Sequence, residues 1–381
     1  MNFRFDLSPS IQFGDNSSKQ VGELISLLHA KKVFCIYDPG VKAAGLVDGI
    51  IEQIRNTGAK VVAYGDVTSD PSSEIVEDAA RIGKKEEVDA LVAIGGGSAM
   101  DCAKAINILL TNDAPIFKYA GLNEVKRPVK PLIAIPTTSG TSSEVTAATV
   151  ISDKKEKKKI VILGRHVGPS HALIDPLLTL GLPPAITAAT GIDALTHAIE
   201  SYTSVNASPV TEVHSLKAIE LIVKNLPKAF DNGNDKKART QMMLACLHAG
   251  FAFGNADLGL VHTIAHPLGA LCGISHGDAN AAMLPFVLAF NADAVPEKTR
   301  DIAKAMGIET KGKSDKETAE LAASKLKELQ CQIGLKSLKK LGVSPSLFDT
   351  LAEDALKEGA LQFNPKKPTK KEIISLLEMA F

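Results

Sequence analysis

Three of the nine histidines fall within residues 255–284, which read NADLGLVHTIAHPLGALCGISHGDANAAML. His262 and His266 are four residues apart, so on a helix they project from the same face, and His276 follows further along. Neutral imidazole is the commonest metal ligand in proteins and also the commonest general acid or base near neutral pH. The stretch alone fits a metal or catalytic site as well as it fits hydrogen-bonded core histidines in a helix kinked at Pro267.

A second motif, GIDALTHAIE, places Asp193 and His197 four residues apart among apolar neighbours. A carboxylate and an imidazole on one helix face make half of a metal site, and ligands from another helix would complete it. The structural alternative is a hydrogen bond between the two side chains. His262 and His276 would complete a set of one carboxylate and three imidazoles. The two motifs together therefore favour a metal site more strongly than either does alone.

The run GGGSAMDCAKA, residues 95–105, follows a predicted strand and opens a predicted helix. Glycines let the backbone approach a ligand closely, and the amide groups at a helix N-terminus bind phosphate. Ser98 is expected to cap this helix. The pattern is not GxGxxG, so the common dinucleotide-binding fingerprint is absent, and the glycines could equally form a plain turn between strand and helix.

A hydroxyl-rich run, PTTSGTSSEVT at residues 136–146, follows another predicted strand. Such a loop suits a polar ligand such as a diphosphate or a ribose, or else satisfies its own backbone. In a parallel sheet both loops would lie at the same edge, where α/β proteins bind ligands. Asp38 also ends a predicted strand. Its carboxylate could accept from ribose hydroxyls, or serve the turn in Asp-Pro-Gly.

The elements that must hold these residues change in kind along the chain. Short apolar runs in the first half predict strands at 32–37, 61–64, 90–94, 132–135, 147–152, 160–163 and 172–175, with helices at 17–30, 41–57 and 72–86. Alternation of this kind is typical of a parallel sheet with crossover helices. Asp70 or Ser72 is expected to cap the third of these helices, and the lysine-rich run 154–159 to form a solvated loop or hairpin tip, apart from Lys159.

After about residue 182 the strand-like runs stop and helix-period segments follow one another. These helices are expected at 185–203, 208–230, 236–254, 260–272, 277–291, 296–306, 315–341, 344–357 and 369–380. We therefore predict an α/β domain over residues 1–181 and an all-helical domain over residues 182–381, with small-molecule sites in the cleft between them.

The composition narrows the functional class. Lys+Arg and Asp+Glu both number 43, and this zero net charge argues against nucleic acid or an anionic membrane as partner. No apolar run reaches the roughly 18 residues of a membrane span, and the N-terminus lacks the pattern of a signal peptide. The five scattered cysteines are typical of reduced thiols. We expect a cytoplasmic protein.

The motifs GGGSAMDCAK, PTTSGTSSEVT, DALTHAIESY and GLVHTIAHPLGALCGISHGDANA resemble the signatures of the iron-containing (group III) alcohol dehydrogenases, over nearly the whole chain. The resemblance implies that family's fold, with an α/β dinucleotide-binding domain and a helical domain shared with dehydroquinate-synthase-like enzymes. It implies that Asp193, His197, His262 and His276 bind Fe²⁺, with Zn²⁺ or Mn²⁺ as alternatives. It also implies that His266 is a catalytic, non-ligand histidine beside the nicotinamide.

The resemblance further implies that NAD(H) is the cofactor. The matching contact positions are Asp38, Asp70, Gly96, Gly97, Ser98, Asp101, Thr137, Thr138, Thr141, Lys159 and His266. Asp38 matches the position linked to NAD over NADP. The family often has Asn-Pro where this chain has Asp70-Pro71, and it often has Pro where this chain has Ser275.

The implied reaction is hydride transfer between NAD(H) and a short-chain alcohol or aldehyde, with the metal acting as Lewis acid. Ala148, Thr149 and Phe253 are expected to line the substrate pocket, and a homodimer or larger homo-oligomer is expected. One rival function is a sugar-phosphate cyclase or lyase of the dehydroquinate-synthase-like type, which would need a dense basic cluster in the second domain. The other rival is a non-catalytic NAD-binding scaffold.

Overall fold

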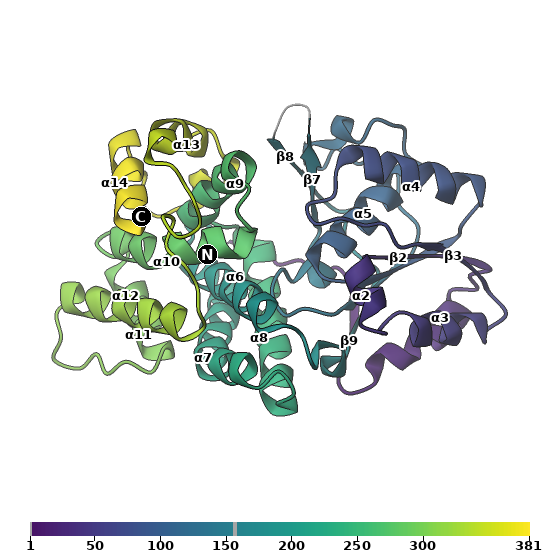
Figure 1. The fold of residues 1–381 in the computed structure, drawn as a ribbon, viewed down its shortest axis with the longest axis horizontal. Coiled ribbons are helices and arrows are strands. Elements are labelled where there is room, and N and C mark those ends of the chain that lie inside the picture. Colours follow the sequence, from purple (N-terminus) through teal and green to yellow (C-terminus); the bar gives the residue numbers. More distant parts are fainter. Residues whose placement is uncertain (1, 155–157) are drawn as a thin grey trace. The chain divides into compact units, whose positions relative to one another are not determined.

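The computed structural model describes the whole chain except residues 1 and 155–157, and the chain divides into two compact units. One unit is Leu7–Leu180, and the other is Gly181–Phe381 together with the N-terminal residues up to Asp6. The first is an α/β unit and the second is helical; in Figure 1 the first runs from purple through blue, and the second from the teal of α6 to yellow. The fold class predicted from the sequence is confirmed.

The α/β unit is built on a six-stranded sheet in which every neighbouring pair is parallel. Its strand order is β1 (Ser10–Phe13), β9 (His171–Ile174), β6 (Leu132–Pro136), β4 (Ala90–Gly95), β2 (Lys32–Tyr37) and β3 (Lys60–Tyr64). The sequence does not predict β1, because this short edge strand is only partly buried and lacks an apolar run. The central strands read as unbroken apolar runs because both of their faces are buried.

Two predicted strands leave the main sheet. β7 (Ala148–Asp153) and β8 (Lys158–Leu163) form an antiparallel hairpin, and β8 also pairs with β5 (Gly121–Leu122) in a separate three-stranded sheet. Residues 155–157 of the lysine-rich run, where a loop or hairpin tip was predicted, lie outside the described residues.

Alternate residues of each central strand pack on opposite faces of the sheet. Phe34 and its neighbours on one face meet α4 (Ser73–Lys85) and α5 (Gly97–Thr111). Val33 and its neighbours on the other meet α1 (Val21–Leu27) and α3 (Asp48–Arg55). The remaining short helices are α2 (Pro39–Ala43) and the 3₁₀-helices η1 (Ser17–Gln20), η2 (Ile116–Tyr119), η3 (Ser143–Val145) and η4 (Pro176–Thr179).

Two helix predictions in the α/β unit need correction. The helix expected at 41–57 is split into α2 and α3, because Gly45 adopts a positive φ of 76° that ends a right-handed helix. Ser98 does not cap α5, because that helix begins at Gly97 and its N-cap is Gly96. Ser72 is the N-cap residue of α4, but its side chain makes no capping hydrogen bond.

The helical unit follows the predicted segments closely. Its long helices are α6 (Pro184–Thr203), α7 (Pro209–Asp231), α8 (Lys236–Ala256), α9 (Leu260–Cys272), α10 (His276–Asn291), α11 (Pro296–Ala305), α12 (Asp315–Gln332), α13 (Phe348–Ala355) and α14 (Lys370–Ala380), with 3₁₀-helices η5 (Pro345–Leu347) and η6 (Gly359–Phe363). Ser208 and Thr369 each begin a helix with a capping box. α12 stops short of residue 341 because Gly334 has a φ of 73°.

The N-terminal residues group with the helical unit, although the sequence predicts them in the α/β domain. Two hydrogen bonds explain this: the Asp6 amide donates to Asn255 Oδ1 at 2.6 Å, and Asn255 Nδ2 donates to the Asp6 carbonyl at 3.1 Å. Phe5 also stacks on His214, with ring centroids 6.1 Å apart.

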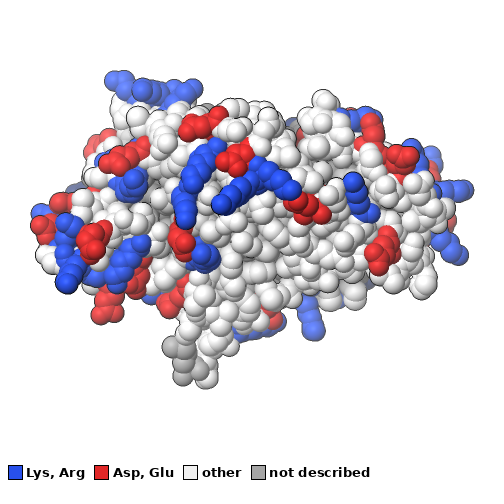
Figure 2. All heavy atoms as spheres, turned by 90° about the horizontal axis from the view of Figure 1, so that it is seen from below, with Lys and Arg blue, Asp and Glu red and all other residues white. Residues whose placement is uncertain are grey.

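Basic and acidic side chains are interspersed on the face drawn in Figure 2. Within the described part of the chain, no single helix is long and apolar enough to cross a membrane; only α8 and α9 taken together pass that test, and they are bent by 99°.

Candidate active site

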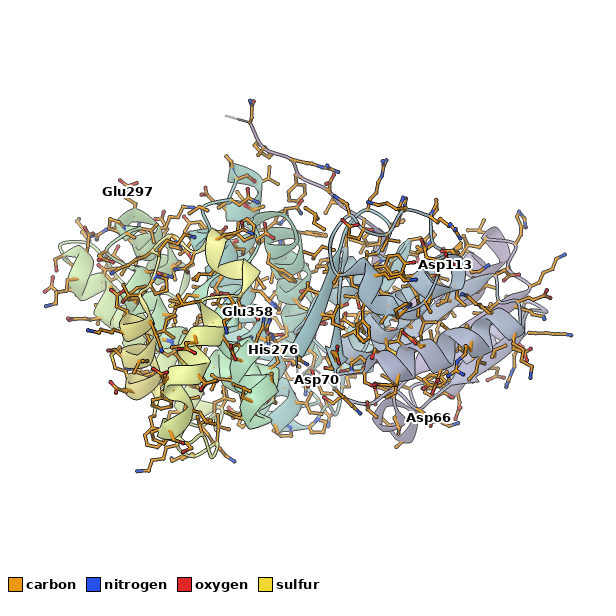
Figure 3. All side chains as sticks on the ribbon, turned by 90° about the horizontal axis from the view of Figure 1, so that it is seen from above. Asp66, Asp70, Asp113, His276, Glu297 and Glu358 are labelled. Carbon is orange, nitrogen blue, oxygen red and sulfur yellow. The ribbon has the colours of Figure 1, made fainter. Side chains whose placement is uncertain are left out.

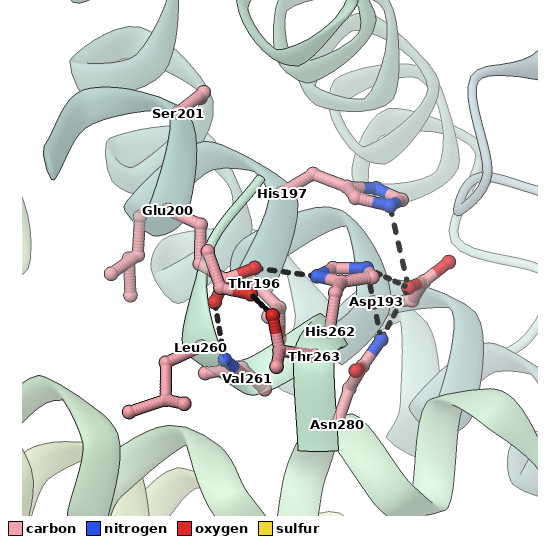
Figure 4. A network of polar contacts seen from close by, with 12 residues as sticks. Asp193, Thr196, His197, Glu200, Ser201, Leu260, Val261, His262, Thr263 and Asn280 are labelled. Atoms are coloured by element: carbon pink, nitrogen blue, oxygen red, sulfur yellow. Dashed lines mark hydrogen bonds and ion pairs between the residues drawn. The ribbon is translucent and has the colours of Figure 1, made fainter. Parts of the chain in front are cut away.

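The four residues proposed as metal ligands come together in the helical unit. Asp193 and His197 lie one turn apart on α6, His262 lies on α9, and His276 is the first residue of α10. The Asp193 Oδ1 atom is 3.6 Å from His197 Nε2, 3.7 Å from His262 Nε2 and 3.5 Å from His276 Nε2. Figure 4 shows the Asp193 carboxylate facing the His197 and His262 rings. All but His276 are buried.

The three separations from Asp193 Oδ1 are those expected between two ligand atoms of one divalent ion. Ligand atoms around a tetrahedral ion at about 2.0–2.2 Å are separated by roughly 3.3–3.6 Å. Asp193, His262 and His276 each offer a ligand atom within 4.8 Å of the others. His197 is not part of this compact group, and its Nε2 atom joins the site through its 3.6 Å distance to Asp193 Oδ1. One carboxylate oxygen and three imidazole nitrogens suit Fe²⁺, Zn²⁺ or Mn²⁺.

Close packing of α10 on α6 brings His276 to Asp193. Gly277 follows His276, and a Cβ atom at that position would lie only 2.4 Å from the Ala189 carbonyl oxygen on α6. The glycine therefore lets the start of α10 touch the α6 backbone.

The charges at this site balance within the ligand set. Burial acts to raise the pKa of Asp193, but the surrounding imidazoles outweigh it and hold the pKa well below its usual range. Burial lowers the pKa of His276 to about 3, which keeps this imidazole neutral. Burial also acts to lower the pKa of His262, but the Glu200 and Asp193 carboxylates outweigh it and raise the pKa to about 9. A divalent ion would take over the positive charge that His262 supplies.

Glu200 is a residue of this site that the sequence reasoning missed. It lies on α6, is buried, and its Oε2 atom is 2.6 Å from His262 Nδ1. Its other oxygen accepts from the Val261 amide at 2.5 Å. Metal-binding histidines commonly donate their second ring nitrogen to a carboxylate. The signal was present in DALTHAIE, where the glutamate follows His197 by three residues.

His266 lies beside the ligand set but outside it. Its ring centroid is 6.3 Å from that of His262 and 5.7 Å from that of His276. Its Nδ1 atom is 2.9 Å from Oε2 of Glu358, which immediately precedes η6. Figure 3 labels Glu358 and His276 within the helical unit. Glu358 was not predicted, because nothing local in the sequence connects it to a histidine 92 residues away.

In the α/β unit, the glycine and hydroxyl loops interlock. A Cβ atom on Gly96 would lie 3.1 Å from Thr138 Oγ1, and one on Gly97 would lie 2.6 Å from Thr141 Cγ2. Glycine is therefore required where the two loops approach each other. Ser98 lies inside α5, and Thr137 is buried directly after the end of β6.

A buried charged cluster joins the same two loops. The Asp101 carboxylate accepts from Ser143 Oγ at 2.6 Å and from the Val150 amide at 2.9 Å. Lys104 donates to Ser143 Oγ at 2.7 Å and to the Ala148 carbonyl at 2.7 Å. Burial lowers the pKa of Lys104 to about 8 and raises the pKa of Asp101. Asp101, expected as a cofactor contact, is thus engaged within the fold and braces the loops.

Two further predicted cofactor residues pair with each other. Lys159 Nζ forms an ion pair with the Asp70 carboxylate, and it also donates to Ser152 Oγ at 3.2 Å. Asp70 has a positive φ of 51° in the turn before α4. The ammonium group therefore offsets the extra carboxylate that this chain carries at that position.

Asp38 serves the turn, one of the two roles considered from the sequence, and its role toward a ribose stays a prediction. Its Oδ1 atom accepts from the Val41 amide at 3.0 Å and so caps α2. Its Oδ2 atom would lie 3.2 Å from a Cβ on Gly95, so the carboxylate borders the glycine loop. Turn chemistry is therefore present, and the second oxygen faces the predicted cofactor loop.

The three residues expected to line the substrate pocket have different surroundings. Thr149 is fully buried, and its hydroxyl donates to the Asp101 carbonyl at 2.8 Å. It therefore faces the interior and does not line a pocket as expected. Ala148 is half-buried in β7. Phe253, half-buried on α8, stacks on His197 with ring centroids 4.2 Å apart.

Comparisons with known proteins cover the whole chain. The family model for iron-containing alcohol dehydrogenase matches residues 8–176, and the model for the C-terminal part of the Fe-containing alcohol dehydrogenase family matches residues 187–381. The 1,3-propanediol dehydrogenase of Citrobacter freundii is 43% identical, over 100% of both chains. The NAD-dependent methanol dehydrogenase of Bacillus methanolicus is 37% identical, over 99% of both.

Solved structures agree with these matches. The crystal structure of a 1,3-propanediol oxidoreductase superposes with a TM-score of 0.97 at 40% identity, covering 100% of both chains. A sulfoacetaldehyde reductase from Bifidobacterium kashiwanohense in complex with NAD⁺ gives a TM-score of 0.89 at 28% identity, covering 100% of this chain and 99% of that one.

Proposed function

The chain belongs to the iron-containing alcohol dehydrogenase family, and from that premise we propose that it transfers hydride between NAD(H) and a short-chain alcohol or aldehyde. Membership itself makes the protein a metal-dependent alcohol oxidoreductase, and none of the comparisons supports a sugar-phosphate cyclase. The observation that carries the proposal is that Nε2 atoms of three histidines, His197, His262 and His276, lie 3.5–3.7 Å from one oxygen of the Asp193 carboxylate.

The proposed division of labour gives NAD(H) binding to the α/β unit, Leu7–Leu180, and metal binding with catalysis to the helical unit. A divalent ion at the four ligands would favour ionisation of an alcohol hydroxyl and would polarise a carbonyl group. Fe²⁺ is the proposed ion, because no thiolate among the ligands selects Zn²⁺, although Zn²⁺ or Mn²⁺ could substitute. His266 is the proposed catalytic residue: the contact of its Nδ1 with Glu358 leaves Nε2 to accept a proton. Phe253 stacks on the His197 ring.

The proposed NAD(H) contacts lie around the interlocked loops. Backbone amides at Gly96, Gly97 and Ser98 open α5, where an N-terminus favours the diphosphate. The hydroxyls of Thr137, Thr138 and Thr141 and the ammonium of Lys159 are the remaining proposed contacts on this side. The Asp38 carboxylate would accept from the ribose hydroxyls and repel a 2′-phosphate. Asp101 is proposed as a brace for these loops and not as a contact.

The proposed substrate is a short primary alcohol or diol, or the matching aldehyde. Relatives of this chain are named for 1,3-propanediol and methanol. Ala148 is small and Phe253 is apolar, and a pocket lined by them would suit a substrate with a short carbon chain. The free thiols of all five cysteines fit a reducing compartment such as the cytoplasm, where we place the protein as a homodimer or larger homo-oligomer.

The test is an aerobic and an anaerobic assay of the purified protein after chelation and reloading with Fe²⁺, Zn²⁺ or Mn²⁺. We expect NADH to accumulate with 1,3-propanediol, butanol or ethanol only after reloading, and His262→Ala to lose both metal and activity. A reloaded protein that reduces NAD⁺ with none of these alcohols, and oxidises NADH with none of their aldehydes, would contradict the proposal.

A further inference from the structure

Asn280 lies at the centre of the ligand set although no motif singles it out. It is fully buried on α10, one turn after His276. Its Nδ2 atom is 2.8 Å from Asp193 Oδ1, 3.2 Å from His276 Nε2 and 3.3 Å from His262 Nε2. Figure 4 shows this amide reaching Asp193 and His262. The amide nitrogen of Asn280 therefore lies close to three of the four atoms proposed to bind the metal.

The oxygen atom of the same amide lacks a hydrogen-bond partner within the part of the chain that the structure describes. Asn280 Oδ1 is buried and has no hydrogen-bond partner among the described residues. Leaving a buried carbonyl oxygen unpaired is costly, and native proteins rarely do so. The nitrogen end of the amide is placed among the proposed ligand atoms, and its oxygen end is left without a described partner.

The hydrogen bonds and a divalent ion make opposite demands on this side chain. Without an ion, the two N–H groups of the amide can donate to the Asp193 carboxylate and to the His276 Nε2 lone pair. With an ion at the same atoms, an N–H group directed at it is repelled, whereas an amide oxygen is attracted. A half-turn about the Cβ–Cγ bond exchanges the two ends within nearly the same volume, since oxygen and NH₂ differ little in size.

We infer that Asn280 is a further residue of the metal site. Its Nδ2 atom keeps the ligand atoms assembled in the metal-free protein, and its Oδ1 atom turns toward the ion once the metal binds. An added carbonyl oxygen favours ions that accept more oxygen ligands, such as Fe²⁺ and Mn²⁺. Zn²⁺ gains less, because it is most often coordinated by four ligands. This inference rests on the metal site of the proposed function.

The experiment measures metal binding and not turnover. Dissociation constants for Mn²⁺ and Zn²⁺ are determined by chelator competition for the wild type, Asn280→Ala and Asn280→Asp. We expect Asn280→Ala to weaken Mn²⁺ binding by about 10–100-fold, the range for groups that support metal ligands, and Zn²⁺ binding by clearly less. Asn280→Asp keeps the oxygen and should restore Mn²⁺ binding. Its metal-free form should melt earlier than the wild type, because its carboxylate would face Asp193.

The matched control is Asn225→Ala, which removes another buried amide, one that donates to the Leu221 carbonyl of its own helix at 2.7 Å. It should lower stability without changing the ratio of Mn²⁺ to Zn²⁺ affinity. Equal Mn²⁺ affinities in the wild type and Asn280→Ala would overturn the inference, and so would an equal loss for both ions. A wild type that binds neither ion would refute the metal site itself.

Discussion

Glu200 Oε2 lies 2.6 Å from Nδ1 of His262, and both side chains are buried. The contact fixes which ring nitrogen of His262 carries the proton, because the carboxylate accepts from Nδ1. When a metal is bound, Nε2, which lies 3.7 Å from Asp193 Oδ1, would be the ring nitrogen left to bind it. The Val261 amide holds the second oxygen of Glu200, so the carboxylate is anchored to the same turn of α9 that carries the histidine.

Replacing Glu200 should therefore weaken metal binding without removing a ligand. A glutamine presents only one acceptor where two donors, His262 Nδ1 and the Val261 amide, now find a carboxylate. We expect Glu200→Gln to lose about 10–100-fold in metal affinity. Chelator competition measures this, with Glu220→Gln, a change in an exposed ion pair on α7, as the control. Unchanged metal affinity in Glu200→Gln would show that the carboxylate does not support the ligand.

Replacing His266 should have a different effect from replacing His262, the proposed metal ligand one turn earlier on α9. If it transfers protons, His266→Gln should keep its metal and lose roughly 10²–10⁴-fold in kcat, the usual contribution of a general acid or base. Metal analysis and steady-state kinetics on the same preparation separate this from a structural role. Loss of the metal together with the side chain, or a wild-type kcat at every pH, would each contradict the assignment. A smaller loss would fit product release as the slow step.

The contact between His266 and Glu358 gives that prediction a second variant. Glu358→Gln retains an acceptor for His266 Nδ1, whereas Glu358→Ala removes it. We expect kcat to fall much further in the alanine variant than in the glutamine variant, with metal content unchanged in both. Equal rates in the two variants would mean that the hydrogen bond does not orient His266.

The sequence predicts those parts of the fold that depend on local patterns. The unbroken apolar run of β4 and the capping residues Ser208 and Thr369 all identify their elements correctly. Positions of helix ends depend on single backbone conformations, such as the positive φ of Gly45, and were less predictable. The edge strand β1 owes its existence to pairing with β9, which lies far along the chain.

The site shows the same division. Spacing and residue type are enough to predict Asp193, His197 and His262 as candidate metal ligands. Glu358 and Asn280 do not, because their roles arise only when distant elements pack together. Thr149 was misassigned for a related reason: a hydroxyl next to the cofactor loop in sequence is turned inward by a hydrogen bond to the Asp101 carbonyl. Tertiary contacts decide such orientations, and no local pattern encodes them.

Asp38 should set the preference for NAD(H), and the test must preserve its capping role. Asn caps a helix as well as Asp does, so Asp38→Asn removes the charge but keeps the hydrogen bond to Val41. We expect the ratio of kcat/KM for NADH to that for NADPH to fall by about tenfold, equivalent to about 1.4 kcal/mol of lost repulsion. Asp48→Asn, which changes an acidic residue in the first turn of α3, is the control. A wild type that already prefers NADPH would contradict the assignment.

Glu144 predicts how stability depends on pH. It is buried in η3 beside the cofactor loops, its Oε1 atom has no hydrogen-bond partner among the described residues, and burial raises its pKa from 4.5 to about 7. A carboxyl group whose pKa is higher in the folded state stabilises the fold below the unfolded value. That stabilisation is lost as the pH rises through the folded value. The wild type should therefore lose stability between about pH 4.5 and pH 7 through this residue.

Glu144→Gln removes this dependence because glutamine stays neutral at every pH. The variant should match the wild type near pH 4.5 and exceed it at pH 8 by at most about 3 kcal/mol, from 1.36 kcal/mol per pKa unit. Urea unfolding of both proteins at several pH values, followed through the α/β unit, measures the difference. Glu320→Gln, an exposed change on α12, should leave the curve unchanged. A constant difference between Glu144→Gln and the wild type from pH 4.5 to pH 8 would mean that Glu144 is already ionised in the folded protein at the lower pH.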